Sequence, residues 1–269
     1  MMRLAVSNLA WDRGVEQEAF SLVQRAGFAG IEVAPTKIAD WKELNRNTLE
    51  SYRLKCEAAM LEVPSLQAIF YGCADAQLLG DRTGFIKMHE HLKHVVDIAF
   101  HLGASIAVFG APKNRQRAEL NEQEASLLAV ERLRLLGDTC LDGGLVLAIE
   151  PVPKYYGSDF LTTASEVESV VLACDHAAVR IHLDCACIQL AGDDPVEVTR
   201  RLGKRAAHYH IAEPDLASFA EPKCDHKAIA HSLKTSGYAG WGAIEMRQQG
   251  ENDLLALQSA LEFAVAVYR

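Results

Sequence analysis

Four side chains of metal-ligand type stand at or near the ends of four apolar runs in the second half of the chain. Glu150 ends "LVLAIE", Asp184 ends "VRIHLD", His210 lies in "AHYHI" and Glu245 lies in "WGAIE". Each run is typical of a buried strand, where a polar group needs a partner. Carboxylates and imidazoles in such places can bind a divalent cation or transfer protons.

The alternation of side chains along a strand tests whether these residues share one face, because residues two apart point the same way. If the four polar residues point inward, the residues that must point outward are Leu147, Ile149, Ile181, Leu183, Tyr209, Ile211 and Ile244. All of them suit packing under helices. Three carboxylates aimed at one place would repel each other by several kcal/mol, roughly, at reduced dielectric. We therefore expect a divalent cation between them.

The donor set indicates which cation to expect. Three carboxylates and one imidazole suit Mn²⁺, with Mg²⁺, Co²⁺ and Zn²⁺ as alternatives, because structural zinc sites favour sulfur and histidine. Any of these residues alone would more often cap a helix or pair with a basic neighbour. Their common position at strand ends favours the metal site.

The elements that must position these residues form a repeating pattern of short apolar runs and longer segments with helical periodicity. The expected strands are 3–10, 30–35, 61–70, 104–112, 145–151, 179–186, 207–214 and 241–247. Gly27 and Gly103 are placed to end helices, and "TTASEVESVVLACD" opens on capping residues. The pattern predicts an α/β fold, a single (β/α)8 TIM barrel over residues 1–269, in which the carboxyl ends of the strands gather at one rim. A doubly wound open sheet is the alternative, although the first turn lacks its G-x-G-x-x-G fingerprint.

Composition narrows the classes of molecule that the protein is expected to bind. The chain has 269 residues, a net charge of -9 and 49% hydrophobic residues. Such an acidic protein is a poor partner for nucleic acid or an anionic membrane surface, and no apolar run is long enough to cross a bilayer. Seven cysteines form no even framework and the first residues resemble a strand rather than a leader, so we expect reduced thiols and a cytoplasmic protein. The sequence leaves a homo-oligomer open.

The sequence resembles the xylose isomerase-like barrels, which include sugar phosphate isomerases and ketose 3-epimerases. The resemblance covers essentially the whole chain and rests on "AIEP", "HLD", "HYH" and "AIEM", with "FGAPKNR" after the fourth strand as a further similar segment. It implies that Glu150, Asp184, His210 and Glu245 are the four metal ligands. It also implies that Glu150 and Glu245 form the acid/base pair.

A cation and two carboxylates are also a chemically reasonable set of groups for moving a proton at a ketose carbon. A cation that holds a ketose carbonyl and the adjacent hydroxyl acidifies the carbon-bound proton and stabilises the resulting enediolate. Carboxylates on opposite faces would give an epimerase, whereas one face alone would give an isomerase. We expect Glu150 and Glu245 to lie on different sides of the substrate, which favours epimerisation. The substrate class is a small sugar, a sugar phosphate or a hydroxyketone.

Substrate contacts are less defined, because the chain departs from its relatives. Cys187 stands where many relatives have a histidine, and "HIAEPDL" offers Glu213 where ketose epimerases often have an arginine. The candidate contacts are Cys187 itself, the cations Lys113, Arg115 and Arg247, and Tyr156 in the loop "PVPKYYGSDF", where an aromatic wall could face the sugar.

Other enzyme classes are compatible with some of these residues. A dehydratase or other lyase could use the same enolate and then expel a hydroxyl. A zinc-dependent abasic-site endonuclease shares such a barrel, but the charge of -9 disfavours it. A Schiff-base aldolase lacks a lysine at the end of the sixth strand. His182 and His208 are expected one layer deeper as hydrogen-bonded residues, and His89, His91, His94 and His101 on a solvated helical face.

Overall fold

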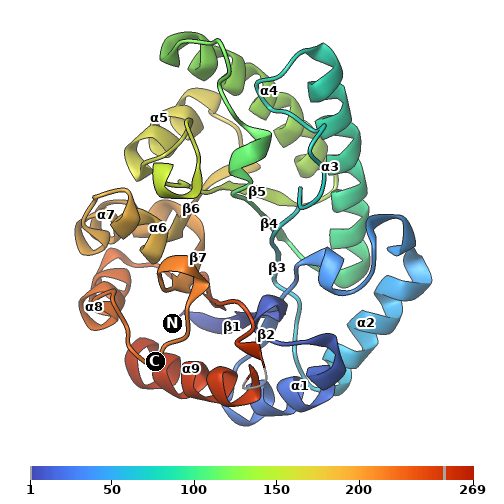
Figure 1. The fold of residues 1–269 in the computed structure, drawn as a ribbon, viewed down its shortest axis with the longest axis vertical. Helices are drawn as coiled ribbons and strands as arrows, with labels where there is room; N and C mark the ends of the chain where they lie inside the picture. The colour runs from blue at the N-terminus through green and yellow to red at the C-terminus, as the bar shows by residue number, and fades with distance from the viewer. Residues whose placement is uncertain (1, 251–252) are drawn as a thin grey trace.

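Eight parallel strands form a nearly closed barrel in the computed structural model, which describes residues 2–250 and 253–269 (Figure 1). The strands are β1 (Arg3–Ser7), β2 (Gly30–Glu32), β3 (Ser65–Leu66), β4 (Ile106–Phe109), β5 (Val146–Ile149), β6 (Val179–Asp184), β7 (Ala206–Ala212) and β8 (Trp241–Glu245). Their order is β2-β1-β8-β7-β6-β5-β4-β3, and isolated parallel bridges join Gly30 to Glu62 and Val33 to Leu66 at the remaining seam. The predicted (β/α)8 barrel is confirmed.

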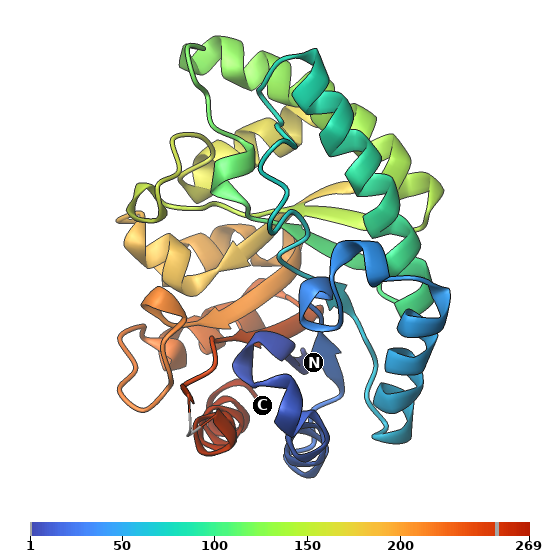
Figure 2. The same ribbon diagram turned by 45° about the vertical axis from the view of Figure 1, so that its right-hand side comes forward.

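Helices surround the strands, as the turned view shows (Figure 2). They are α1 (Glu16–Arg25), α2 (Arg46–Ala58), α3 (Arg82–Leu102), α4 (Glu122–Asp142), α5 (Ala164–Cys174), α6 (Cys185–Leu190), α7 (Pro195–Leu202), α8 (His226–Ser236) and α9 (Asp253–Tyr268). The predicted end signals hold: Gly103 ends α3 at φ 81°, Gly27 follows α1 at φ 76°, and the Thr163 side chain caps α5 by accepting from the Glu166 N–H.

The third strand is much shorter than predicted, with only Ser65 and Leu66 in the ladder. Pro64 has no N–H to donate to a ladder, and Ala68 adopts a left-handed conformation at φ 52°. These two residues limit the extended segment on either side. Of the rest of the predicted run, residues 67–70 lie in the loop after β3, and Glu62 keeps only an isolated bridge to Gly30.

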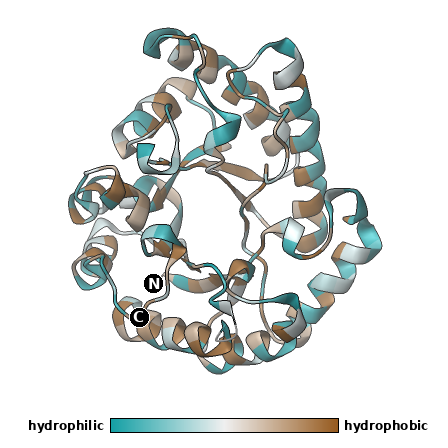
Figure 3. Cartoon of the chain, in the orientation of Figure 1, coloured by the Kyte–Doolittle hydropathy of each residue, from teal (hydrophilic) through white to brown (hydrophobic). Residues whose placement is uncertain are grey.

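The core lies between the strands and the helices, and Figure 3 shows apolar residues on the strands and polar ones on the outer surfaces of the helices. The residues predicted to point outward from β5 to β8 are all buried in this core. Inside the barrel the layer is polar instead, with Glu32, His182 and His208 each 0% exposed. The barrel therefore presents charged side chains inward, as the alternation required.

The histidines of α3 are half-buried and bonded, so the expectation of a solvated face was wrong. His91 Nε2 lies 2.7 Å from the Ile69 carbonyl oxygen, and His94 Nε2 lies 3.1 Å from that of Trp41. These contacts hold the loop after β3 and the segment before α2 against α3. Among the described residues, no helix is long and apolar enough to span a membrane.

Candidate metal centre and active site

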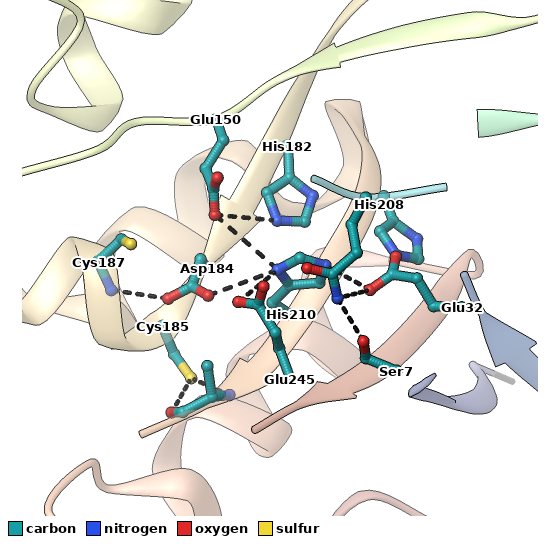
Figure 4. Close-up of polar contacts among 12 residues, drawn as sticks. Ser7, Glu32, Glu150, His182, Asp184, Cys185, Cys187, His208, His210 and Glu245 are labelled. Atoms are coloured by element: carbon teal, nitrogen blue, oxygen red, sulfur yellow. Dashed lines mark hydrogen bonds and ion pairs between the residues drawn. The ribbon is translucent and has the colours of Figure 1, made fainter. Parts of the chain in front are cut away.

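One ligand atom each from Glu150, Asp184, His210 and Glu245 can be chosen so that all four lie within 4.8 Å of one another (Figure 4). His210 Nδ1 is the centre of the group. It lies 3.2 Å from Glu245 Oε2, 3.6 Å from Asp184 Oδ2 and 3.8 Å from Glu150 Oε1. The arrangement brings three carboxylates and one imidazole to the carboxyl ends of β5 to β8.

Strand ends explain this convergence. Glu150 directly follows β5, and Asp184 and Glu245 are the last residues of β6 and β8. In the parallel register Asp184 pairs with His210, so the two side chains stand side by side on the inner face. Asp184 is also the N-cap of α6, where its Oδ1 accepts from the Cys187 N–H at 2.7 Å. This bond orients the carboxylate and leaves Oδ2 directed at His210.

The electrostatics of the group show an excess of negative charge. Burial raises the pKa of Glu150 well above its usual value, and the carboxylates of Glu245 and Asp184 raise it further. Burial likewise raises the pKa of Glu245. His210 is buried too, but the neighbouring Glu32 and Glu245 raise its pKa well above the ordinary histidine value. A bound cation would relieve this repulsion and favour the ionised carboxylates.

The donors fit a divalent cation. His210 Nδ1 is buried and has no hydrogen-bond partner, although carboxylate oxygens surround it at 3.2–3.8 Å. Ligands at about 2.1 Å from one ion lie roughly 3 to 4 Å apart, which matches these separations. Oxygen-rich donors with one imidazole are compatible with Mn²⁺, Mg²⁺, Co²⁺ or Zn²⁺.

A pocket of about 860 Å³ opens next to this group and reaches Glu150, Glu245, Gln67, Phe70 and Lys113. An adjoining pocket of about 340 Å³ shares Glu150 and Glu245. The predicted contacts that line this second pocket are Tyr156, Cys187 and Arg247. Together the pockets offer room for a small ligand beside the carboxylates.

The prediction that Arg115 contacts substrate was wrong, because its side chain is buried and does not line either pocket. It is 0% exposed and donates to the carbonyl oxygens of Phe109 at 3.3 Å and Leu161 at 3.4 Å. Its positive charge acts on Glu150 from within the protein. The turn at Pro112–Asn114 directs the chain inward after β4, which the sequence did not reveal.

Comparison with known proteins agrees with this architecture. Residues 20–265 match the model of the xylose isomerase-like TIM barrel. The chain belongs to this family. An inosose dehydratase of Clostridium botulinum is 23% identical over 272 residues, which cover 93% of this chain and 86% of that protein.

Solved structures of other barrels superpose well. D-psicose 3-epimerase from Clostridium cellulolyticum, solved with D-tagatose, has a TM-score of 0.80 and 14% identity, with 100% of both chains covered. The IolI protein with a bound zinc atom has a TM-score of 0.76 and 18% identity, covering 99% of this chain and 98% of that one. At these identities the likeness establishes the shared fold.

This xylose isomerase-like barrel contains a further buried acid, Glu32, that was not predicted as a site residue from the sequence. Glu32, at the end of β2, lies beneath the four converging side chains and contacts both His208 and His210. The signal was present in "GIEVAP", since an acid ending an apolar strand is the same pattern that pointed to Glu150. His208 is hydrogen-bonded there as expected, whereas neither ring nitrogen of His182 makes a hydrogen bond, although its Nε2 lies 3.7 Å from Glu150 Oε1.

Proposed function

We propose that this chain is a divalent-metal-dependent epimerase or isomerase of a small carbohydrate that acts through an enediolate. The observation that carries the proposal is the convergence of Glu150, Asp184, His210 and Glu245 beside a pocket at the barrel mouth. The family membership supports it, as do the similarities to a protein named for ketose epimerisation and to one named for inosose dehydration.

The four side chains would hold the cation, and Asp184 and His210 would serve only in that role. When bound, the cation polarises the carbonyl and adjacent hydroxyl of the substrate and stabilises the negative charge that develops on loss of the C–H proton. Glu150 and Glu245 border both pockets, so they can also reach a substrate carbon. We assign proton removal to one of them and proton return to the other.

Glu150 follows β5 and Glu245 ends β8, and β6 and β7 lie between these two strands in the sheet. A substrate bound between the two side chains would meet one carboxylate on each face. Removal of the proton on one face and its return on the other inverts the carbon centre, so we favour epimerisation over isomerisation.

Dehydration is the second candidate, and the similarity to inosose dehydratase over 93% of this chain favours it. It begins with the same abstraction of a proton next to the carbonyl. The outcome then depends on whether the adjacent carbon bears a hydroxyl that can leave as water when a second carboxyl group protonates it. Mn²⁺ remains our preferred cation on the donor set, with Zn²⁺ the alternative supported by the zinc-bearing IolI structure.

Solvent exchange tests this proposal directly. Protein freed of metal and reloaded with Mn²⁺ is incubated in D2O with a panel of ketoses and inososes, and products are followed by NMR and mass spectrometry. Epimerisation places deuterium at the inverted carbon, while dehydration also removes one water from the product. An active enzyme with full turnover after metal removal would contradict the proposed metal dependence.

The acid/base assignment is tested by two single variants. Glu150→Gln and Glu245→Gln should each slow turnover by about a hundredfold or more, the scale expected for a positioned acid or base. In an epimerase, one variant should still exchange the substrate proton for deuterium without forming the epimer. Near-normal turnover in both variants would overturn the assignment.

A further inference from the structure

The carboxylate of Glu32 lies within hydrogen-bond distance of four side chains. Figure 4 shows it beside the rings of His208 and His210. Oε2 lies 2.7 Å from both Ser65 Oγ and His208 Nε2. Oε1 lies 2.9 Å from Gln67 Nε2 and 2.9 Å from His210 Nε2, although the His210 N–H does not point straight at it. A carboxylate has about four acceptor positions, and Ser65, Gln67 and His208 take three of them, which leaves one for His210 Nε2.

This arrangement limits where the histidines carry their protons. An ionised carboxylate only accepts hydrogen bonds, so His208 must present an N–H at Nε2. The lone pair of an unprotonated Nε2 on His210, 2.9 Å from the same carboxylate, would be repelled by it, which favours an N–H there as well. In a neutral imidazole the other nitrogen then has a free lone pair. For His210 that nitrogen is Nδ1, the atom that faces Glu245, Asp184 and Glu150.

We propose that Glu32 is a positioning residue that fixes His210 as its Nε2–H tautomer and thereby presents Nδ1 to the cation. The inference rests on the proposed metal site. Histidine ligands of metals commonly donate their second N–H to a carboxylate, which sets the ring orientation and increases affinity. Glu32 reaches His210 from β2, on the opposite side of the barrel from β5 and β6.

Glu32 is itself held in place by its surroundings. Ser65 and Gln67 approach it from β3 and the loop after it, and Gln67 also donates to Ser7 Oγ of β1 at 2.6 Å. All these side chains are buried, with at most 3% of each exposed. The network connects β1, β2, β3 and β7, and it transmits their relative positions to the ring of His210.

The test compares the cation affinity of wild-type protein with that of Glu32→Gln by titration of metal-free protein with Mn²⁺. The variant keeps the shape of the side chain but removes its charge and half of its acceptor capacity. We expect affinity to fall by about tenfold to a hundredfold. In the Zn²⁺-loaded wild type, nitrogen NMR should show His210 ligated through Nδ1, with a hydrogen-bonded Nε2–H signal that shifts or disappears in Glu32→Gln.

Glu213→Gln is the matched control, because Glu213 also accepts from a buried histidine, His226 Nε2, at 2.7 Å. This control should lower thermal stability without weakening Mn²⁺ binding. If Glu32→Gln fails to fold, Ser65→Ala removes one donor to Glu32 and should weaken binding by a smaller factor, about threefold.

The results separate this inference from the proposed function. If wild type binds Mn²⁺ and Glu32→Gln binds it with equal affinity, only the role of Glu32 is overturned. Ser65→Ala takes the place of Glu32→Gln in this comparison if Glu32→Gln does not fold. Ligation of His210 through Nε2, or an equal loss of affinity in Glu213→Gln, also overturns the role of Glu32. A wild-type chain that binds no divalent cation would overturn the metal site and this inference together.

Discussion

Tyr156 shows how a single side chain can shape the pocket without touching the cation. It lines the smaller pocket, and its hydroxyl oxygen accepts from the Asp215 N–H at 2.7 Å. Asp215 has a left-handed backbone at φ 63°, which is unfavourable for a residue with a side chain. The tyrosine therefore helps to hold a strained turn at the edge of the site.

Replacing Tyr156 with alanine should raise the Michaelis constant of the authentic substrate by about tenfold and leave metal content unchanged, because one pocket wall and one hydrogen bond are lost. Steady-state kinetics and metal analysis measure the two effects. Tyr155→Ala is the control, since Tyr155 is 61% exposed and lies outside the lining of both pockets. A parallel loss of metal from Tyr156→Ala would contradict this role.

Single residues of the site show what the sequence could predict. Strand alternation placed Glu150, Asp184, His210 and Glu245 on one inner face, because the period of a strand is regular. It could not place Arg115, whose direction depends on a turn where Ala111 takes a left-handed conformation at φ 30°. Strand alternation also applies to Glu32 and could have placed it on the inner face. Its partners could not be predicted, because they come from segments far away in the sequence.

The backbone directly after β4 comes close to the Glu150 side chain, which follows β5, and limits where the carboxylate can lie. Gly110 follows β4 directly, and a Cβ atom there would lie only 2.1 Å from Glu150 Oε2. Glycine is therefore required for the carboxylate to occupy its present place. The backbone after one strand sets the position of the side chain after the next.

Gly110→Ala should displace the Glu150 carboxylate and reduce Mn²⁺ affinity and turnover by about tenfold or more. The far end of Glu150 can rotate away, so the melting temperature should change far less than these two quantities. Calorimetric titration with Mn²⁺ and thermal unfolding measure them separately. Unchanged affinity and turnover would show that the carboxylate position is not critical.

Loops at the barrel mouth form the least predictable elements. Four pocket residues with side chains have left-handed backbones: Ala68, Ala111, Asp215 and Leu216. Sequence patterns favour glycine or asparagine at such positions, so these turns gave no signal. The sequence predicted the strand ends that carry the site and some pocket-lining residues such as Tyr156, but it could not predict the turns that shape the pocket walls.

Across the whole molecule, a second buried Glu–His pair fastens the last helices to the barrel. His226 at the start of α8 contacts Glu213 after β7 at 2.7 Å and the Tyr268 hydroxyl of α9 at 2.6 Å. Burial lowers the pKa of His226, but hydrogen bonds with Cys185 and Glu213 outweigh it and raise the value to about 9. The pair therefore couples stability to pH.

The folded pKa of His226 lies above its ordinary value of 6.5, so its stabilisation is fully present below about pH 6.5 and is lost as pH rises through about 9. We expect the melting temperature of wild type to exceed that of His226→Asn most near pH 6.5, and the difference to shrink towards pH 9. Thermal unfolding across this interval measures it. A difference that stays constant with pH would contradict the prediction.

One divalent cation should bind where β5 to β8 end, and a titration of metal-free protein with Mn²⁺, followed by electron paramagnetic resonance, measures this binding. We predict one tightly bound ion per chain in wild type and an affinity at least about tenfold weaker in Asp184→Asn, which keeps the shape of a ligand but removes its charge. Equal binding by Asp184→Asn and wild type, or no binding by either, would contradict a metal site at these strand ends.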